Sequence, residues 1–293
     1  MRVGTSIPQV CLAPFQPRAP QRVRVPRGAW DTHTHVIGTP PEYPWVSPRN
    51  YNPPSASRED YISHLDALGI DYGVLVQISV HGIDNRALVE ALTAYPDRLR
   101  GIAVVTPTVS DEELDTLNAA GVRGVRVVTL VAGGVGLETV RPLAERIAPF
   151  NWHLQIATDG ATLATIEPML KALPVTVVLD HFGGCDPAEG IEGTGFRALR
   201  RLVDAGAFVK LSGAYRLTEP PWDAIAPLAR QLIAAAPDRL VWASDWPHVA
   251  ISDSKLMPRT EATLDLLQHW TEDEVIQRRI LVENPVKLYG LPG

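Results

Sequence analysis

Short apolar runs alternate with helical patterns from residue 30 to the end of this 293-residue chain. The apolar runs have the length and the content of branched residues that are typical of β-strands. The eight predicted strands cover residues 31–37, 72–78, 100–105, 124–128, 153–157, 175–180, 208–211 and 241–244. Eight strands interleaved with helices in a chain of this length predict a single α/β domain, a (β/α)₈ barrel.

Helix signals fill the intervals between these runs. Ser57 and Ser110 each precede an acidic first turn, a pattern that starts a helix, and the two helices should stop at Gly69 and Gly121. Further helical patterns cover residues 137–147, 161–173, 196–205 and 222–236, and another begins at 271–274. A doubly wound open sheet is the alternative, but it usually carries a glycine-rich phosphate loop after its first strand. No such loop follows residue 37, so the barrel is favoured.

The composition indicates an ordinary globular protein. Hydrophobic residues make up 45% of the chain, the net charge is −6, and there is no basic block. We therefore expect neither nucleic acid nor a membrane as a partner. Two cysteines and the lack of a signal peptide favour the cytoplasm. The proline-rich residues 1–28 are predicted to form an extended arm, and residues 29–293 a single barrel domain.

A pair of histidines occupies the first predicted strand. Alternate residues of a strand share a face, so His33 and His35 should project together with Asp31, with Thr32 and Thr34 facing the other way. Two imidazoles on one face can bind a metal or polarise a carbonyl group.

Polar side chains also follow other predicted strands, where a barrel gathers its catalytic groups. They are Ser79, His81, Arg126, His181, Lys210, Ser212, Tyr215, Arg216 and Asp245. Each also has a purely structural interpretation: His181 as a core histidine, Asp245 as a helix cap, the arginines as surface ion pairs and Lys210 as a strand residue. His64 and His269 lie on helical patterns and are expected at the surface.

The ordered motifs resemble a known family. They are WDTHTHV at 30–36, VQISVHGIDN at 76–85, RGVR at 123–126, DH at 180–181, SDWPH at 244–248 and ENP at 283–285. Across residues 26–290 the chain resembles the amidohydrolase superfamily, in particular the 2-pyrone-4,6-dicarboxylate lactonase group. That group includes sugar lactonases, a galactarolactone isomerase and a sulfomuconolactone hydrolase. The resemblance implies a distorted TIM barrel that acts on lactones in carbohydrate or aromatic-acid catabolism.

Position by position, the resemblance implies a catalytic set and a substrate-binding set. The catalytic set is His33, His35, His181 and Asp245, and the substrate-binding set is Tyr51, Ser79, His81, Arg126 and Arg216. The chain departs from the pyrone-dicarboxylate enzyme in three places. Residues 128–132 lack its second arginine, Ala157 replaces a tyrosine, and Gly184 replaces an arginine. Arginine is the natural partner of a carboxylate, so these losses argue against pyrone dicarboxylate as the substrate.

The metal content is a separate question. The lysine or glutamate that bridges two ions in many amidohydrolases is absent at Val127-Val128, and the histidine of the fifth strand is absent at Ala157-Thr158. These absences argue against a binuclear site. The group includes members that work without metal, so we expect no required cofactor. One zinc ion on His33, His35, Asp245 and His181 is the alternative.

The sequence thus predicts a hydrolase that opens a small carboxylated lactone. Asp245 would take a proton from water, the three histidines would polarise the carbonyl group, and the arginines would hold the carboxylate. The alternatives are a lactone isomerase that acts on an aldarolactone, a zinc-dependent decarboxylase, and a non-catalytic binder of carbohydrate acids. A homo-oligomer is left open.

Overall fold

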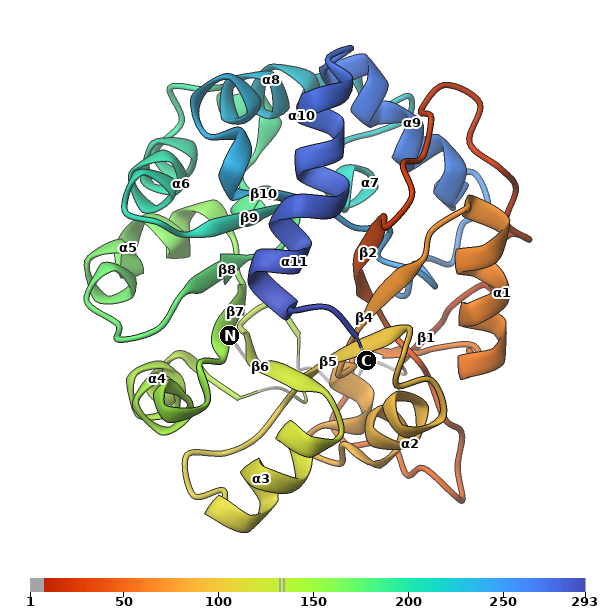
Figure 1. Ribbon diagram of the computed structural model, residues 1–293, viewed down its shortest axis with the longest axis vertical. Coiled ribbons are helices and arrows are strands. Elements are labelled where there is room, and N and C mark those ends of the chain that lie inside the picture. Colours follow the sequence, from red (N-terminus) through yellow and green to blue (C-terminus); the bar gives the residue numbers. More distant parts are fainter. Residues whose placement is uncertain (1–7, 132, 134, 293) are drawn as a thin grey trace.

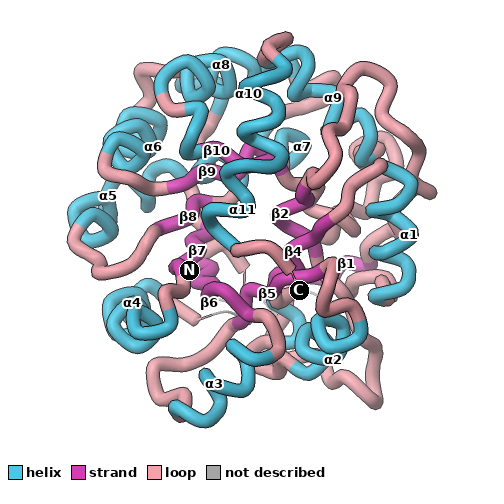
Figure 2. Tube along the Cα trace, in the orientation of Figure 1, coloured by secondary structure: helices cyan, strands magenta, loops and turns pink. Residues whose placement is uncertain are grey.

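Eight parallel strands form the centre of the computed structural model, which describes residues 8–131, 133 and 135–292. The strands are β2 (Trp30–Thr34), β4 (Tyr72–Val76), β5 (Leu99–Ala103), β6 (Val122–Val128), β7 (His153–Ala157), β8 (Val177–Leu179), β9 (Phe208–Leu211) and β10 (Leu240–Trp242). They pair in the order β10-β9-β8-β7-β6-β5-β4-β2 and are ringed by helices (Figures 1 and 2). The predicted (β/α)₈ barrel is confirmed, and each predicted strand corresponds to one observed strand.

The sheet closes where β2 meets the segment after β10. Thr34 and Trp246 form a parallel bridge. The backbone N–H of Asp245 donates to the carbonyl oxygen of His33, and the N–H of His35 donates to that of Trp246, each at 2.9 Å. We call this junction the seam. It fixes the ends of the first and last barrel strands against each other.

Asp31 takes part in the seam rather than in the histidine pair. The pairing of β2 with β4 is irregular between Asp31 and Thr34. The Asp31 carboxylate accepts hydrogen bonds from the backbone N–H (2.8 Å) and hydroxyl (2.5 Å) of Ser244. Burial raises the pKa of Asp31 to about 7, against the lowering effect of these hydrogen bonds. The alternation rule, which places Asp31 beside His33 and His35, therefore does not hold at this irregular strand.

Helices cover the outside of the barrel (Figure 2). They are α1 (Arg58–Leu68), α2 (Arg86–Ala94), α3 (Asp111–Ala119), α4 (Val140–Ile147), α5 (Gly160–Lys171), α6 (Thr194–Asp204), α7 (Ala214–Leu217), α8 (Ala226–Ala235), α9 (Thr260–Trp270), α10 (Glu274–Arg278) and α11 (Asn284–Tyr289). Ser57 forms a capping box with Asp60, and the Ser110 hydroxyl accepts the Glu113 N–H. Helices α2 and α9 were not predicted, and neither begins with a side-chain cap. No helix in the described part of the chain is long and apolar enough to cross a membrane.

Helix α11 lies across the end of the barrel at which the strands begin (Figure 1). Its Tyr289 stacks on Trp30, the first residue of β2, with ring centroids 5.9 Å apart. Tyr289 also meets the edge of His153, the first residue of β7, at 5.3 Å. All three side chains are buried. This aromatic cluster closes one end of the barrel, so a site is expected at the other.

Residues 8–28 contain a single short strand, β1 (Gln9–Val10), which pairs in parallel with β3 (Tyr51–Asn52). Farther along, the backbone N–H groups of residues 21–23 donate to the Asp265 carboxylate on α9. The segment therefore lies against the barrel. The division into an arm over 1–28 and one domain over 29–293 stays a prediction, and residues 1–7, 132, 134 and 293 lie outside the described residues.

One surface prediction is wrong. His64 lies on the inner face of α1 and is 1% exposed, with its ring 5.3 Å from that of Trp246 at the seam. Burial lowers the pKa of His64 to about 3, so the ring is neutral. Its helical position alone could not show that α1 presses this face onto an aromatic residue. His269 is exposed, as expected.

The junction of α5 and α6 yields a stability prediction. The Glu167 carboxylate accepts two hydrogen bonds from Arg201. Lys171 Nζ also lies 2.8 Å from Glu167 Oε1. Hydrogen bonding by Arg201 lowers the pKa of Glu167 from its usual 4.5 to about 2. Because the folded-state pKa is the lower one, the ion pair stabilises the fold above about pH 4.5, and this contribution is lost as the pH falls towards 2.

We expect Glu167→Gln to lower the free energy of unfolding at pH 7 by about 1 kcal/mol, because Arg201 is half exposed and partly screened by water. The difference from the parent should shrink as the pH falls below the usual carboxyl pKa. Urea unfolding at neutral and acidic pH measures it. Glu145→Gln, at an exposed position on α4, is the control. A loss of unfolding free energy in Glu167→Gln that does not change with pH would contradict a stabilising ion pair at Glu167.

Candidate active site

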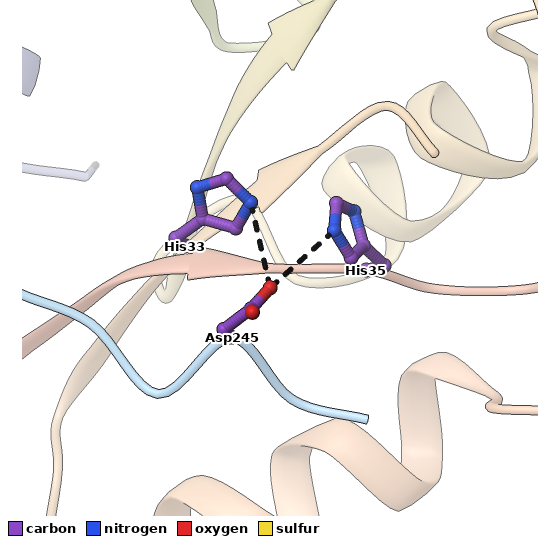
Figure 3. A group of neighbouring side chains, drawn as sticks. All are labelled: His33, His35 and Asp245. Carbon is purple, nitrogen blue, oxygen red and sulfur yellow. Dashed lines mark ion pairs between the residues drawn. The ribbon is translucent and has the colours of Figure 1, made fainter. Parts of the chain in front are cut away.

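Three histidines and one aspartate meet where the barrel strands end. His33 belongs to β2 and His35 follows it, His181 follows β8, and Asp245 follows β10. Asp245 Oδ1 lies 3.8 Å from both His33 Nε2 and His35 Nε2 (Figure 3). Its Oδ2 lies 3.8 Å from His181 Nε2. The structure thus brings together all four members of the predicted catalytic set.

The backbone is strained at two of these residues. His181 has φ 48° and Asp245 φ 61°, in the left-handed region that side chains with a Cβ atom rarely adopt. Such conformations cluster at functional sites, where the surrounding structure holds them. Gly213, after β9, makes room for His181: a Cβ atom there would lie 2.8 Å from His181 Nδ1. These turns aim both side chains at the same space.

Asp245 is anchored through its second oxygen. Oδ2 accepts hydrogen bonds from Tyr215 Oη at 2.6 Å and from Arg216 Nε at 2.5 Å. Burial acts to raise the pKa of Asp245, but the Arg216 guanidinium and the neighbouring histidines hold it well below its usual value. Arg216, predicted to bind the substrate carboxylate, therefore already has a carboxylate partner in the protein. Tyr215 was absent from the predicted set although it directly precedes Arg216.

The hydrogen bonds of His35 fix its tautomer. His35 Nδ1 lies 2.7 Å from the carbonyl oxygen of Val76, which can only accept, so Nδ1 carries the proton. Burial, then Arg126, lowers the pKa of His35 to about 3, and the ring is neutral. His35 Nε2 therefore presents a lone pair towards Asp245.

His33 is arranged in the same way. The shortest contact of its Nδ1 is with an acceptor, Asp180 Oδ1, at 3.2 Å, whereas the donors Lys210 Nζ and Gln155 Nε2 lie at 3.3 and 3.4 Å. Burial keeps the pKa of His33 well below its usual value. Its Nε2 is buried and has no hydrogen-bond partner among the described residues. An imidazole that donates through Nδ1 to a carboxylate and leaves Nε2 free is the usual arrangement of a metal-ligating histidine.

A buried polar cluster lies behind His33. Asp180 accepts from Arg126 Nε at 3.1 Å and from Gln155 Nε2 at 3.0 Å, and Lys210 Nζ lies 3.5 Å away. Lys210 is fully buried and donates to Gln155 Oε1 and to the backbone oxygen of Thr32. Burial lowers the pKa of Lys210 to about 8. Asp180, Gln155 and Lys210 were missing from the predicted set; the position of Asp180 at the end of a predicted strand was the available signal.

A small cavity of about 100 Å³ opens over the site. Its lining includes His35, His181 and Asp245 together with four of the five predicted substrate-binding residues, Tyr51, Ser79, Arg126 and Arg216. Tyr51 Oη and Ser79 Oγ share a hydrogen bond of 2.9 Å. The fifth, His81, is not part of this lining: its Nε2 lies 3.2 Å from the Gly38 carbonyl oxygen and its ring stacks on Tyr43. That position follows from η1 (Ser79–His81), the short 3₁₀ turn that His81 ends.

The donor set fits one divalent ion. His33 Nε2, His35 Nε2 and Asp245 Oδ1 lie within 4.8 Å of one another, and all three residues are buried. Two imidazole nitrogens and a carboxylate are ligands that zinc prefers. His33, Asp180 and His181 form a second group of suitable spacing, but Asp180 already accepts hydrogen bonds from Arg126 and Gln155. The first group therefore fits better.

Comparisons with known proteins agree with this geometry. The chain is 35% identical over 289 residues to 4-sulfomuconolactone hydrolase of Rhizobium radiobacter, covering 96% of each chain. It is 33% identical to 2-pyrone-4,6-dicarboxylate hydrolase of Comamonas testosteroni, covering 93% of each. A crystal structure of a probable 2-pyrone-4,6-dicarboxylic acid hydrolase from Acinetobacter baumannii, with citric acid bound, superposes with a TM-score of 0.79 at 32% identity, over 90% of this chain and 99% of that one. The amidohydrolase family model matches residues 30–291. The chain therefore belongs to the amidohydrolase family.

Proposed function

We propose that this chain hydrolyses the ester bond of a small carboxylated lactone. The observation that carries the proposal is the carboxylate of Asp245, faced at 3.8 Å by three imidazole nitrogens inside a cavity that an arginine also lines. The relatives named above, which align over nearly the whole chain, support it, because their names describe hydrolases of lactones.

Asp245 is the general base of the proposed reaction. Tyr215 and Arg216 hold Oδ2, while Oδ1 has no hydrogen-bond donor in the described part of the chain. A water molecule at Oδ1 is thus oriented by a carboxylate that cannot rotate. The depressed pKa keeps Asp245 ionised at neutral pH, so it can accept the proton of the attacking water and return it to the leaving alkoxide.

His181 is the imidazole suited to stabilise the developing oxyanion. Its Nδ1 lies 2.8 Å from the Ser212 hydroxyl, which can donate as well as accept. When Ser212 donates, His181 carries its proton on Nε2, which faces the cavity. His33 and His35 cannot do this without breaking their Nδ1–H bonds to Asp180 and Val76. Of the three histidines predicted to polarise the carbonyl, we therefore propose that His181 donates a hydrogen bond, whereas His33 and His35 present lone pairs.

Those two lone pairs, with Asp245 Oδ1, would hold a zinc ion, in which case Oδ1 would both contact the ion and accept the proton of the attacking water. A bound zinc ion supplies a Lewis acid for the lactone carbonyl. The donor arrangement favours this alternative over the metal-free site that the sequence predicts.

The cytoplasmic location is also part of this proposal, because Cys11 and Cys185 are both free thiols. Assembly into a homo-oligomer stays open.

Metal analysis tests the zinc site. We expect about one zinc ion per chain in protein purified without chelator, because a site of two histidines and an aspartate binds zinc. His35→Gln should lose the ion, whereas His269→Gln, at an exposed position, should keep it. A metal-free preparation that opens lactones at the full rate would restore the metal-free interpretation.

Replacement of the base tests the role of Asp245. We expect Asp245→Asn to lower kcat by about 10²–10⁴-fold, the usual contribution of a general base. Asp97→Asn, at an exposed position before β5, should retain the parental rate. Circular dichroism and thermal unfolding check that both variants fold. Near-normal turnover by folded Asp245→Asn would exclude this residue as the base.

The product distinguishes hydrolysis from the alternatives. In H₂¹⁸O, hydrolysis should give an open hydroxy acid with one labelled carboxylate oxygen, because the attacking oxygen comes from water. NMR and mass spectrometry of the product measure this. A rearranged, unlabelled lactone would identify an isomerase, and release of carbon dioxide a decarboxylase.

A further inference from the structure

The cavity holds one guanidinium group whose terminal nitrogens are free. Arg126 uses Nε to bind Asp180, and its side chain is 9% exposed. Its Nη1 and Nη2 make no hydrogen bond to any described residue, although Arg126 lines the cavity. A buried guanidinium with two free N–H edges is a bidentate receptor for a carboxylate. Tyr51 and Ser79 line the same cavity and offer hydroxyl groups.

The remaining charges of the site balance in pairs. Arg216 and Asp245 form a direct ion pair. Behind the cavity, Lys210 lies 3.5 Å from Asp180 and balances the negative charge of that carboxylate. The positive charge of Arg126 is therefore not cancelled by Asp180. Among the side chains of the site, one positive charge, that of Arg126, therefore remains for a ligand. A single negative charge on the ligand satisfies it.

An apolar wall adjoins Arg126. Side chains two residues apart on a strand share a face, so Val128 lies one step above Arg126 on β6. Its partner on β7 is Ala157, just as Gln155 is the partner of Arg126. Leu130 and Val131 extend this wall beyond the strand, and all four line the cavity. None of these side chains can donate a hydrogen bond.

We propose that the substrate is a singly charged lactone that carries a hydrocarbon substituent. Its one carboxylate binds Arg126, and the substituent packs on the wall formed by Val128, Leu130, Val131 and Ala157. A second anionic group on that side would lose its hydration without gaining a donor, which disfavours binding. The inference rests on the proposed lactone hydrolysis and adds which lactones the site accepts.

A matched substrate series tests this. The probes are five-membered unsaturated lactones with one carboxymethyl group and, on the ring carbon that bears it, hydrogen, methyl, carboxylate or sulfonate. We expect kcat/KM for the methyl compound to exceed that for hydrogen by about fourfold, as burial of one methyl group gives. It should exceed kcat/KM for the carboxylate and sulfonate compounds by at least about tenfold.

A variant tests the wall directly. Leu130 is 52% exposed, so Leu130→Arg adds a positive charge to the wall without disturbing the core. It should narrow or reverse the preference against the doubly charged lactones. Ile191→Arg, at a comparably exposed position that is not part of the cavity lining, should leave the preference unchanged.

Binding of unreactive analogues separates the two proposals. Cyclopentylacetate and its 1-carboxy derivative mimic the singly and doubly charged lactones but cannot be hydrolysed, and their inhibition or thermal shift reports binding alone. If the parent opens the doubly charged lactones as well as the methyl compound, or binds the dicarboxylate analogue more tightly, this inference is overturned and hydrolysis stands. If it prefers the singly charged analogue but opens no lactone, the hydrolysis proposal fails.

Discussion

The seam between the first and last barrel strands is the constraint on which the site depends. The hydrogen bond from the Asp245 N–H to the His33 carbonyl oxygen joins two residues from opposite ends of the barrel sequence. The same junction binds His35 to Trp246 and Asp31 to Ser244. Without the seam, His33 and His35 would lie at one edge of an open sheet and Asp245 at the other. Barrel closure and assembly of the site are therefore one event.

Behind the seam, buried charges hold the first imidazole in place. Asp180 receives hydrogen bonds or close contacts from His33, Arg126, Gln155 and Lys210, and each of these comes from a different strand. Burying two cations and an anion is costly unless they are paired and hydrogen-bonded, as they are here. In return, the ring of His33 is held in one orientation.

Much of the fold could be predicted because its signals are local. Apolar runs marked all eight strands, and the caps at Ser57 and Ser110 marked two helices. Helices α2 and α9 lack such caps, and nothing local showed that α1 would bury His64.

The candidate site was predictable only in part, for a similar reason. The strand-end rule located His33, His35, His181 and Asp245, since it depends only on where strands stop. The partners of these residues depend on the register between strands that are distant in sequence. Arg216 was therefore predicted to bind the substrate carboxylate, although it is the partner of Asp245. The contact between Asp180 and His33 was not predicted.

The single unpaired guanidinium of Arg126 has a consequence for the end of the reaction. Opening a lactone turns a neutral ester into a second carboxylate, so the product carries one negative charge more than the substrate. Among the side chains that line the pocket, no second cation is free to match it, because Arg216 is paired with Asp245. Because Tyr289 and Trp30 close the far end of the barrel, the product leaves by the opening through which the substrate entered. In the metal-free site, charge repulsion created by the chemistry itself would thus drive product release, whereas a zinc ion held by His33, His35 and Asp245 would retain the product.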